Sequence, residues 1–487
     1  MNQLTIIGAG IAGLSAGIYA QKRGFQCNIY EQHILPGGNC TSWKRKGYTF
    51  EGGLHWLTGS KIDLPLYKEW NYLGAISPST KIHNREAFIS CVLDKQIFCF
   101  YTNLERLRDH LLEISPADET AIKKLYKQIR RFSNIVMPVF DVPGVKLKEH
   151  SNKPPLSMLF TMMALAPFGK ITAKEYAKNF KHPAIRLMLE EIAGAENKAS
   201  HMLTLLASVC SGDGGYPEGG SAEMAKRMAK YFEKLGGKIY YSSNVEKINI
   251  EKNKVVSIIV NGNRIDTSRL IVTNDTREAI DTLFKNPLNE SWCHRMRQDT
   301  KPVMCTFVSI GLKKDWKHLP SNFVIPLRET LSFGNFTYKS LFLNNYASYS
   351  NYAPSGCTAV TCILFGDSYS YWKKAKENGS YLNKKKAFAE QFANTLISNF
   401  QLSRDDIDII DIATPLTFER YCGTYHGSWM TIDEVGKKAA TYPIKSETIS
   451  NIYFAGQRIM SPGGTPVALV TARQAVQYLC KDKGMPF

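Results

Sequence analysis

Three glycines near the start of the chain, Gly8, Gly10 and Gly13, have the spacing of a turn that binds phosphate groups. In this pattern the first glycine permits a tight turn, the second lets the backbone approach a pyrophosphate, and the third lets a helix pack closely against a strand. Glu31 follows where such a site needs an acceptor for the ribose hydroxyls. These residues predict a dinucleotide-binding site; the alternative is a tight strand–helix turn without a nucleotide.

The elements that must position these residues are predicted on either side of them. Residues 4 to 7 are apolar and predict a buried strand, and Leu14 with the small residues around it predicts the packed face of a helix. Gly24 is the expected end of that helix, and residues 26 to 30 predict a second strand that leads directly into the acid. The helix N-terminus then faces the phosphates.

A second glycine-rich segment follows the acid. Gly37 and Gly38 come soon after Glu31, and a further glycine-rich run covers residues 47 to 55. Nicotinamide-binding domains do not normally insert such a segment, and the sequence shows no second strand–glycine–helix unit for a nicotinamide. The electron partner stays unknown, because a lipid-soluble quinone, oxygen or no external acceptor are all compatible with this pattern.

Four segments, in this order along the chain, resemble the FAD-dependent amine oxidase and phytoene desaturase superfamily, closest to its branch of carotenoid desaturases, carotene isomerases and retinol saturases. They are residues 5–55, the GGYPEGGS run at 214–221, residues 245–274, and residues 451–480 with YFAGQ at 453–457 and PGGTPV at 462–467. The resemblance implies FAD as the cofactor. It also implies an α/β fold in which a Rossmann-like FAD-binding domain is interleaved with an α+β substrate domain.

The resemblance assigns individual residues to the FAD site. Those expected to contact the cofactor are Gly8, Gly10, Ala12, Gly13, Glu31, Gly37, Gly38, Gly53, Leu54, His55, Val245, Asn274, Gly456, Gln457, Gly464, Thr465, Pro466 and Val467. Two residues depart from the family's pattern: Gln457 stands where an acidic residue is common beside the ribityl chain, and Asn39 replaces a basic residue that often follows the glycine pair. Both departures alter the phosphate contacts without removing the site.

The resemblance also nominates residues for catalysis. The family places the flavin ring near the segment after Gly53, so His55 and Trp56 are expected beside it, and His55 could donate a hydrogen bond or a proton. Tyr425 and His426 are a second candidate, an acid pair for a carbon beside a double bond, and His426→Ala should lower turnover by about 10²-fold or more. The alternatives are a packed histidine at position 55 and an aromatic turn at 425–426 that joins two domains.

Other polar residues carry weaker expectations. Five of them could line the far side of the pocket or serve the structure alone: Glu196, Asn197, His201, Asp213 and Tyr216. Aspartate and histidine pairs with the spacing of metal ligands are absent from the sequence, so we expect no metal.

The change of pattern along the chain predicts that two domains alternate over five segments. The FAD-binding domain is expected to comprise residues 1–78, 214–299 and 431–487, and the substrate domain residues 79–213, which are mostly helical, and 300–430. Strands are expected at 91–100, 304–312, 357–364 and 408–414, and an Asn261-Gly262 hairpin turn between two more.

Composition limits the cellular setting. A strand that begins at residue 4 leaves no room for a signal peptide, and the eleven cysteines form no CxxC pair, which favours free thiols in a reducing cytoplasm. No nucleic-acid motif accompanies the net charge of +18. An uncharged stretch at 156–168, between Lys153 and Lys170, could dip into an anionic membrane and place the protein peripherally on the inner membrane face. The alternative is a buried core helix.

The sequence therefore favours an FAD-dependent oxidoreductase that desaturates or saturates carbon–carbon double bonds of an apolar polyene, retinoid-like, terpenoid or steroidal substrate. The alternatives are a flavin-dependent isomerase with no net redox change, an amine oxidase, and a prenyl-protein escort of the same fold that is not an enzyme. An intact glycine triplet, Glu31 and the C-terminal flavin loop count against the escort.

Overall fold

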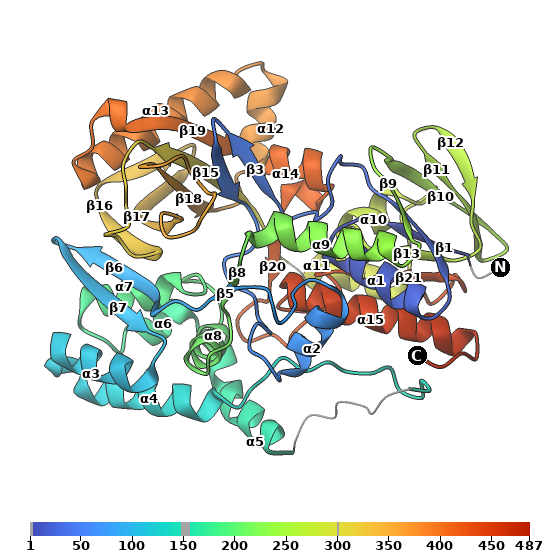
Figure 1. Ribbon diagram of the computed structural model, residues 1–487, viewed down its shortest axis with the longest axis horizontal. Coiled ribbons are helices and arrows are strands. Elements are labelled where there is room, and N and C mark those ends of the chain that lie inside the picture. Colours follow the sequence, from blue (N-terminus) through green and yellow to red (C-terminus); the bar gives the residue numbers. More distant parts are fainter. Residues whose placement is uncertain (1–2, 148–155, 300) are drawn as a thin grey trace.

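The nucleotide-binding unit predicted from the glycines forms the centre of one half of the molecule (Figure 1). The computed structural model describes residues 3–147, 156–299 and 301–487. Strand β1 (Gln3–Ile7) leads into helix α1 (Ile11–Lys22), and β2 (Gln26–Tyr30) returns beside β1 in parallel register. Later segments of the chain add β9 (Lys238–Tyr240), β13 (Leu270–Val272) and β21 (Ile452–Phe454), all parallel, in the order β21-β13-β1-β2-β9.

Helix α1 is buried on every side, because helices from distant segments of the chain pack against it. Its first ten residues, Ile11 to Ala20, are all buried, as expected of a helix without a polar face. Helix α9 (Gly220–Lys234) and the C-terminal helix α15 (Gly464–Asp482) flank it. At Gly17 an added Cβ would lie 2.7 Å from the Phe232 ring, so close packing with α9 requires glycine there.

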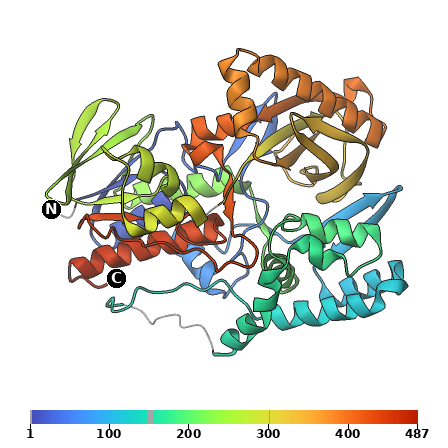
Figure 2. The same ribbon diagram turned by 180° about the vertical axis from the view of Figure 1, so that it is seen from behind.

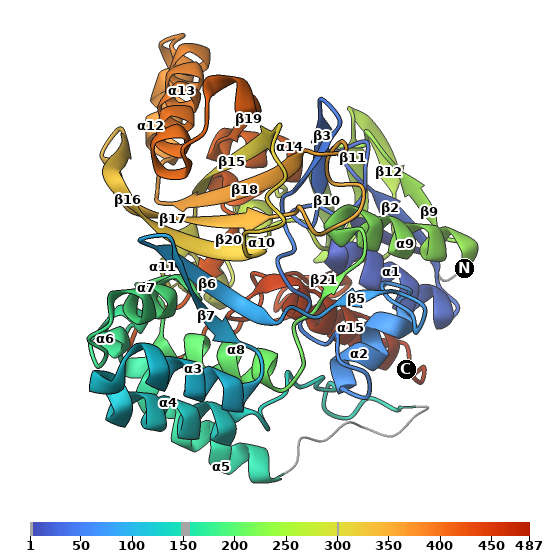
Figure 3. The same cartoon turned by 60° about the vertical axis from the view of Figure 1, so that its left-hand side comes forward.

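A seven-stranded sheet forms a second layer. Its order is β19 (Ile407–Ala413), β15 (Cys305–Leu312), β18 (Thr358–Phe365), β17 (Phe336–Asn345), β16 (Asn322–Phe333), β6 (Ala87–Leu93) and β7 (Gln96–Tyr101). Helices α12 (Tyr369–Glu377) and α13 (Tyr381–Phe400) cover one face of it (Figure 3). The other face looks towards the rest of the molecule.

A helical layer packs against the end of this sheet that contains β6 and β7. It consists of α3 (Leu104–Ile114), α4 (Glu119–Phe132), α5 (Leu156–Leu165), α6 (Ala173–Ala177), α7 (Pro183–Glu191) and α8 (Ala199–Cys210). Helix α5 forms the outer edge of the layer, and the view from behind shows the same arrangement (Figure 2). No helix in the described ranges is long and apolar enough to cross a membrane.

The remaining elements are short. They are β3 (Ser42–Arg45), β4 (Tyr48–Glu51), α2 (Pro65–Tyr72), β5 (Ile82–His83), β8 (Tyr216–Pro217), β10 (Val245–Glu251), β11 (Lys254–Val260), β12 (Asn263–Asp266), α10 (Thr276–Thr282), α11 (Ser291–Asp299), β14 (Lys301–Val303), α14 (Pro415–Cys422) and β20 (Met430–Ile432), with 3₁₀ turns at Pro116–Asp118, Ala166–Lys170, Arg404–Asp406 and Tyr425–Gly427. The predicted turn joins β11 and β12, with both Asn261 and Gly262 at positive φ.

The α/β fold class predicted from the sequence is confirmed, with a parallel Rossmann-like sheet and a separate multi-stranded sheet. The strands expected at 91–100, 304–312, 357–364 and 408–414 are present within one or a few residues. Two long strands that the sequence did not predict, β16 and β17, lie at the middle of the second sheet. All eleven cysteines fall within the described ranges and are free thiols there.

Candidate active site

A cavity of about 1960 Å³ lies where the parallel sheet, the seven-stranded sheet and the helical layer meet. It is lined by seventeen of the eighteen residues predicted to contact the cofactor. The exception among the described residues is Gly13, where an added Cβ would lie 1.9 Å from the Gly8 carbonyl oxygen. Gly13 therefore permits the close approach of α1 to β1, which is the role that the sequence pattern assigns to the third glycine.

The glycine turn leaves room at its second position. Gly8 has a φ of +96°, which favours glycine. An added Cβ at Gly10 would meet no protein atom closer than the Gly37 carbonyl oxygen at 3.8 Å, so this position faces the cavity. The Gly37 amide donates to the Ala9 carbonyl over 2.9 Å and brings the second glycine pair alongside the first turn. The two turns together form a wall of glycine backbone that lines the cavity, as a pyrophosphate site needs.

Glu31 is held in place by two backbone amides. Its Oε2 accepts from Ala9 over 2.6 Å and its Oε1 from His33 over 2.9 Å. Burial raises the pKa of the carboxyl group, and the hydrogen bonds from His33 and Ala9 oppose that rise. The side chain lines the cavity beside the glycine turn, where a ribose would lie next to the pyrophosphate.

The two residues that depart from the family's pattern converge on one atom. Asn39 Nδ2 donates to the Trp429 carbonyl oxygen over 3.2 Å, and Gln457 Nε2 donates to the same oxygen over 3.3 Å. The Trp429 indole in turn donates to the Gly52 carbonyl over 3.2 Å, and the side-chain Oε1 of Gln457 accepts from the Gly464 backbone amide. Amide side chains at positions 39 and 457 thus fix Trp429 in the cavity wall, which the sequence pattern did not predict.

Several buried polar atoms around this region of the cavity have no hydrogen-bond partner within the described ranges. They are Asn39 Oδ1, Asn274 Oδ1, Thr424 Oγ1 and Arg458 Nη1. Arg458 is 4% exposed, and its guanidinium forms an ion pair with Asp275 at 2.9 Å. Buried polar groups are almost always satisfied. These donors and acceptors, with the open space at Gly10, fit a ligand rich in phosphate, hydroxyl and carbonyl groups, as FAD is.

His55, directly after the glycine-rich run, lies in the cavity wall. Its ring centroid is 5.8 Å from that of Trp429, and neither ring nitrogen has a hydrogen-bond partner among the described residues. Burial lowers the pKa of His55 to about 4, aided by the charge of Arg85 and opposed by the neighbouring Asn344 amide. The ring is therefore neutral near pH 7, with one nitrogen able to donate and the other to accept.

Tyr425 and His426 are outside the described lining of the cavity. The His426 ring is stacked between the rings of Tyr369 and Tyr425, with centroid distances of 4.3 Å and 4.0 Å. The Arg277 guanidinium lies over the Tyr425 ring. His426 also has a φ of +50°, so the turn itself is constrained. The structure does not bring this pair to the cavity.

The polar residues given weaker expectations divide into two groups. Glu196, Asn197 and His201 line the cavity. Asp213 instead accepts from the backbone amides of residues 59–61, and Tyr216 donates to Glu51, so both hold the structure together.

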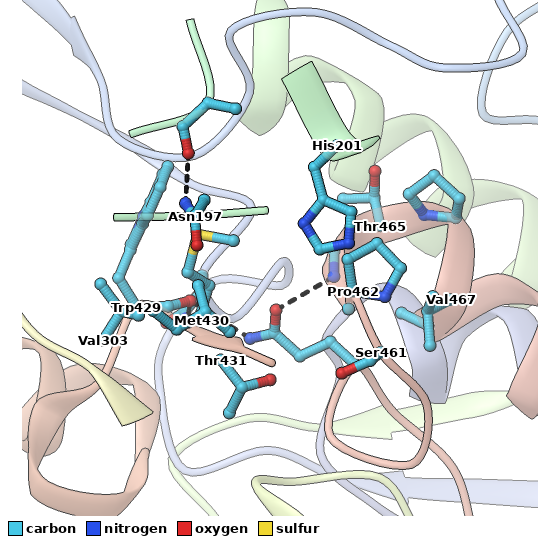
Figure 4. A pocket seen from close by; sticks show the side chains of 18 of the residues that line it. Asn197, His201, Val303, Trp429, Met430, Thr431, Ser461, Pro462, Thr465 and Val467 are labelled. Carbon is cyan, nitrogen blue, oxygen red and sulfur yellow. Dashed lines mark hydrogen bonds between the residues drawn. The ribbon is translucent and has the colours of Figure 1, made fainter. Parts of the chain in front are cut away.

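His201 lies beside the C-terminal loop at 462–467 in the cavity wall. Figure 4 shows its ring next to Pro462 and Thr465. Close by, Lys198 and Asp433 form a buried ion pair at 3.5 Å, with side chains 7% and 4% exposed. Burial lowers the pKa of His201, while Asp433 opposes and Lys198 adds to that effect. The spacing of Lys198 and Asp433 in the sequence, more than 200 residues, gave no signal of this pair.

The same cavity also has a large apolar lining, to which helix α5 contributes. Apolar side chains from the sheet and from the helical layer line it, among them Phe88, Ile135, Met137, Met158, Leu159, Met162, Leu165, Leu205, Phe342, Ile363 and Phe365. On α5 itself Leu159, Phe160 and Met163 are 56%, 63% and 65% exposed. The side chains of residues 156 and 157 and the flanking Lys153 lie outside the described set. Among the described residues, no group of three His, Cys, Asp or Glu could hold a metal ion.

Comparison with known proteins agrees with this geometry. The family model for flavin-containing amine oxidoreductases matches residues 11–480. The chain is 23% identical to chloroplastic prolycopene isomerase of Daucus carota, over 99% of this chain and 80% of that protein. It is 23% identical to 1-hydroxycarotenoid 3,4-desaturase of Flavobacterium sp. (97% and 98%) and 21% identical to all-trans-retinol 13,14-reductase of Danio rerio (94% and 82%).

Among solved structures, cyclohexylamine oxidase from Brevibacterium oxydans IH-35A has a TM-score of 0.60 at 11% identity, with 99% of each chain covered. At this identity the likeness shows the fold. The family match extends over nearly the whole sequence. The chain belongs to the flavin-containing amine oxidoreductase family and is an FAD-dependent oxidoreductase.

Proposed function

We propose that this enzyme desaturates or saturates carbon–carbon double bonds of a long apolar molecule, such as a polyene, retinoid-like, terpenoid or steroidal compound. The observation that carries the proposal is that one cavity is lined both by the glycine turns with His55 and by a large set of apolar side chains. Its volume of about 1960 Å³ exceeds the roughly 300–1,000 Å³ of a typical small-molecule site, so it has room for FAD and a second large ligand.

In this proposal, individual residues of the chain have distinct roles around the bound FAD. When bound, FAD supplies the hydride chemistry. Trp429, fixed by Asn39 and Gln457, closes the wall beside His55 and excludes water from it. His55 is the candidate for holding or moving a proton, since its neutral ring has two unpartnered nitrogens within the described ranges. His201, which also lines the cavity, is the second candidate.

The relatives support a substrate of this class and leave two reaction types. Their names describe a carotenoid desaturase, a retinol reductase and a prolycopene isomerase. A reaction without net redox change is therefore the second candidate function, which the isomerase similarity favours.

The test is anaerobic mixing of the holoenzyme with polyenes while the flavin absorbance is followed. Desaturation should bleach oxidised flavin, and saturation should restore the absorbance of reduced flavin. Isomerisation should give product while the flavin stays reduced over many turnovers. Bleaching by putrescine or cyclohexylamine, with every polyene inactive, would overturn the proposal in favour of amine oxidation.

We also propose that α5 rests on an anionic membrane surface, from which an apolar substrate could enter. Three large apolar side chains of this helix, Leu159, Phe160 and Met163, are more than half exposed, and Leu159 also lines the cavity. The exposed Lys170 and Lys174 follow and also line the cavity. Exposed apolar side chains beside basic residues suit the boundary of an anionic bilayer.

Vesicle flotation tests this contact. The triple variant Leu159→Ser, Phe160→Ser, Met163→Ser should bind vesicles of mixed anionic and neutral phospholipid less than the wild type does, and high salt should weaken wild-type binding. Leu382→Ser is the matched control, because Leu382 is 74% exposed on α13, away from the cavity lining. Wild-type protein that fails to float at low salt would refute the contact.

A further inference from the structure

The wall of the cavity beside His55 contains two buried asparagines on neighbouring strands of the seven-stranded sheet. Asn322 on β16 and Asn344 on β17 are 4% and 2% exposed, and both line the cavity. They are direct cross-strand partners in the β16–β17 register, so their side chains lie on the same face of the sheet. Their neighbours on that face, Val324 and Phe342, are apolar.

Three of the four amide atoms of this pair lack a hydrogen-bond partner among the described residues. Asn322 Nδ2 donates to the Phe88 carbonyl over 3.2 Å, while Asn322 Oδ1 and both Nδ2 and Oδ1 of Asn344 remain unpartnered. An unsatisfied buried polar atom destabilises a fold, and such atoms are rare in proteins. A buried donor and buried acceptors on residues that line a cavity therefore point to a ligand that completes them.

The pair belongs to a polar row that crosses the sheet. Asn344 is opposite Thr361 on β18, and Thr361 is opposite Ser309 on β15. Thr361 and Ser309 are fully buried and also have an unpartnered hydroxyl within the described ranges, but they are outside the described lining of the cavity. The row thus contains two positions that a ligand can reach and two that it cannot.

We propose that Asn322 and Asn344 bind an oxygen function, a hydroxyl or a carbonyl, carried by an otherwise apolar substrate. An asparagine amide both donates and accepts, which matches a hydroxyl group. His55, whose ring nitrogens are also unpartnered and which lies beside Asn344, completes the site. The substrate class is then an apolar alcohol or ketone, with its oxygen near the reacting end of the cavity. This inference rests on the proposed function, because it assumes that an apolar molecule enters the cavity.

Binding of matched pairs to the holoenzyme tests the proposal. The probes are all-trans-retinol with its 15-deoxy hydrocarbon, and 1-hydroxylycopene with lycopene, each titrated by the change in polyene absorbance and flavin fluorescence. Wild-type protein should bind the alcohol of at least one pair roughly tenfold or more tighter than the hydrocarbon, as one buried hydrogen bond to a hydroxyl can provide. Equal binding within both pairs would overturn the inference alone. A wild type that binds none of the four probes would overturn the proposed function and the inference with it.

Leucine variants locate the preference. Asn344→Leu and, independently, Asn322→Leu should bring the alcohol-to-hydrocarbon ratio close to one while FAD content, flavin absorbance and hydrocarbon affinity stay unchanged. Ser309→Ala is the matched control, since it removes an equally buried hydroxyl of the same row that the ligand cannot reach, and it should keep the wild-type ratio.

Stability separates a ligand site from a structural role. Because Asn344→Leu removes two unsatisfied buried atoms, the ligand-free variant should melt at a higher temperature than the wild type. A lower melting temperature together with equal loss of affinity for alcohol and hydrocarbon would show that Asn344 serves the fold. Loss of FAD, or a changed flavin spectrum without any polyene, would show that the amides serve the cofactor. Either result overturns the inference.

Discussion

Replacing Gly10 by valine should remove FAD while leaving the protein folded. Gly10 has φ −69° and ψ 179°, a conformation that valine adopts without strain. The nearest protein atoms to an added Cβ are the Gly37 oxygen at 3.8 Å and the Gly38 Cα at 4.0 Å, which are ordinary contacts. The new side chain therefore occupies cavity space that the pyrophosphate needs. Loss of two charge-assisted hydrogen bonds, at about 1.5–3 kcal/mol each, weakens FAD binding by about 10²-fold or more.

Gly13→Ala is the informative comparison, because it lies one turn further along the same helix. Its Cβ would lie 1.9 Å from the Gly8 oxygen and 2.7 Å from Thr273 Oγ1, so this change should destabilise the apoprotein by about 1–3 kcal/mol or more. FAD binding by both variants is measured by the flavin-to-protein ratio and by reconstitution of the apoprotein with FAD. The stability of both apoproteins is measured by thermal unfolding. Tight FAD retention by Gly10→Val, or an unperturbed Gly13→Ala apoprotein, would refute the roles assigned to these glycines.

Three further outcomes are expected. Glu31→Ala should weaken FAD binding by about 1–3 kcal/mol, measured by reconstitution titration, and unchanged affinity would remove Glu31 from the ribose site. His55→Leu should reduce the loss of stability that the wild type shows between pH 6.5 and 4. The pKa of His55 is about 4 in the folded state and near 6.5 in the unfolded state, so protonation favours the unfolded wild type by up to about 3 kcal/mol as the pH falls through this window. Urea unfolding at several pH values measures the free energy of unfolding, and equal pH slopes for both proteins would contradict the prediction. His426→Ala tests two expectations against each other: the sequence pattern predicts about a 10²-fold loss of turnover, while its stacking outside the described cavity lining favours near-normal turnover with a loss of stability.

The FAD half of the site could be predicted because its chemistry depends on local sequence. A phosphate-binding turn needs glycines at fixed spacing between a strand and a helix, so Gly8, Gly10 and Gly13 reveal it without any tertiary information. The C-terminal loop at 462–467 is a contiguous motif of the same kind. Both therefore reach the cavity as expected, apart from Gly13, whose role is packing.

The substrate half could not be predicted in the same way, because its residues meet only through the fold. The Tyr425-His426 pair looked chemically suitable in sequence, yet a ring stack with Tyr369 holds it away from the cavity lining. Lys198 and Asp433 become a buried pair across more than 200 residues, and no periodicity marks either one. The sequence analysis also did not predict strands β16 and β17. It therefore could not identify which of their residues lie on the face towards the cavity.

The roles of Asn322 and Asn344 could not be predicted from the sequence. Each stands at a strand end among apolar residues, where an asparagine is ordinarily taken as the start of a turn. Their role becomes visible only in the structure, where the strand register places them opposite each other and both line the cavity. The fold tolerates unsatisfied amides at this point and packs apolar side chains around them. Buried polar atoms that destabilise the fold are expected where a ligand, rather than the protein, completes their hydrogen bonds.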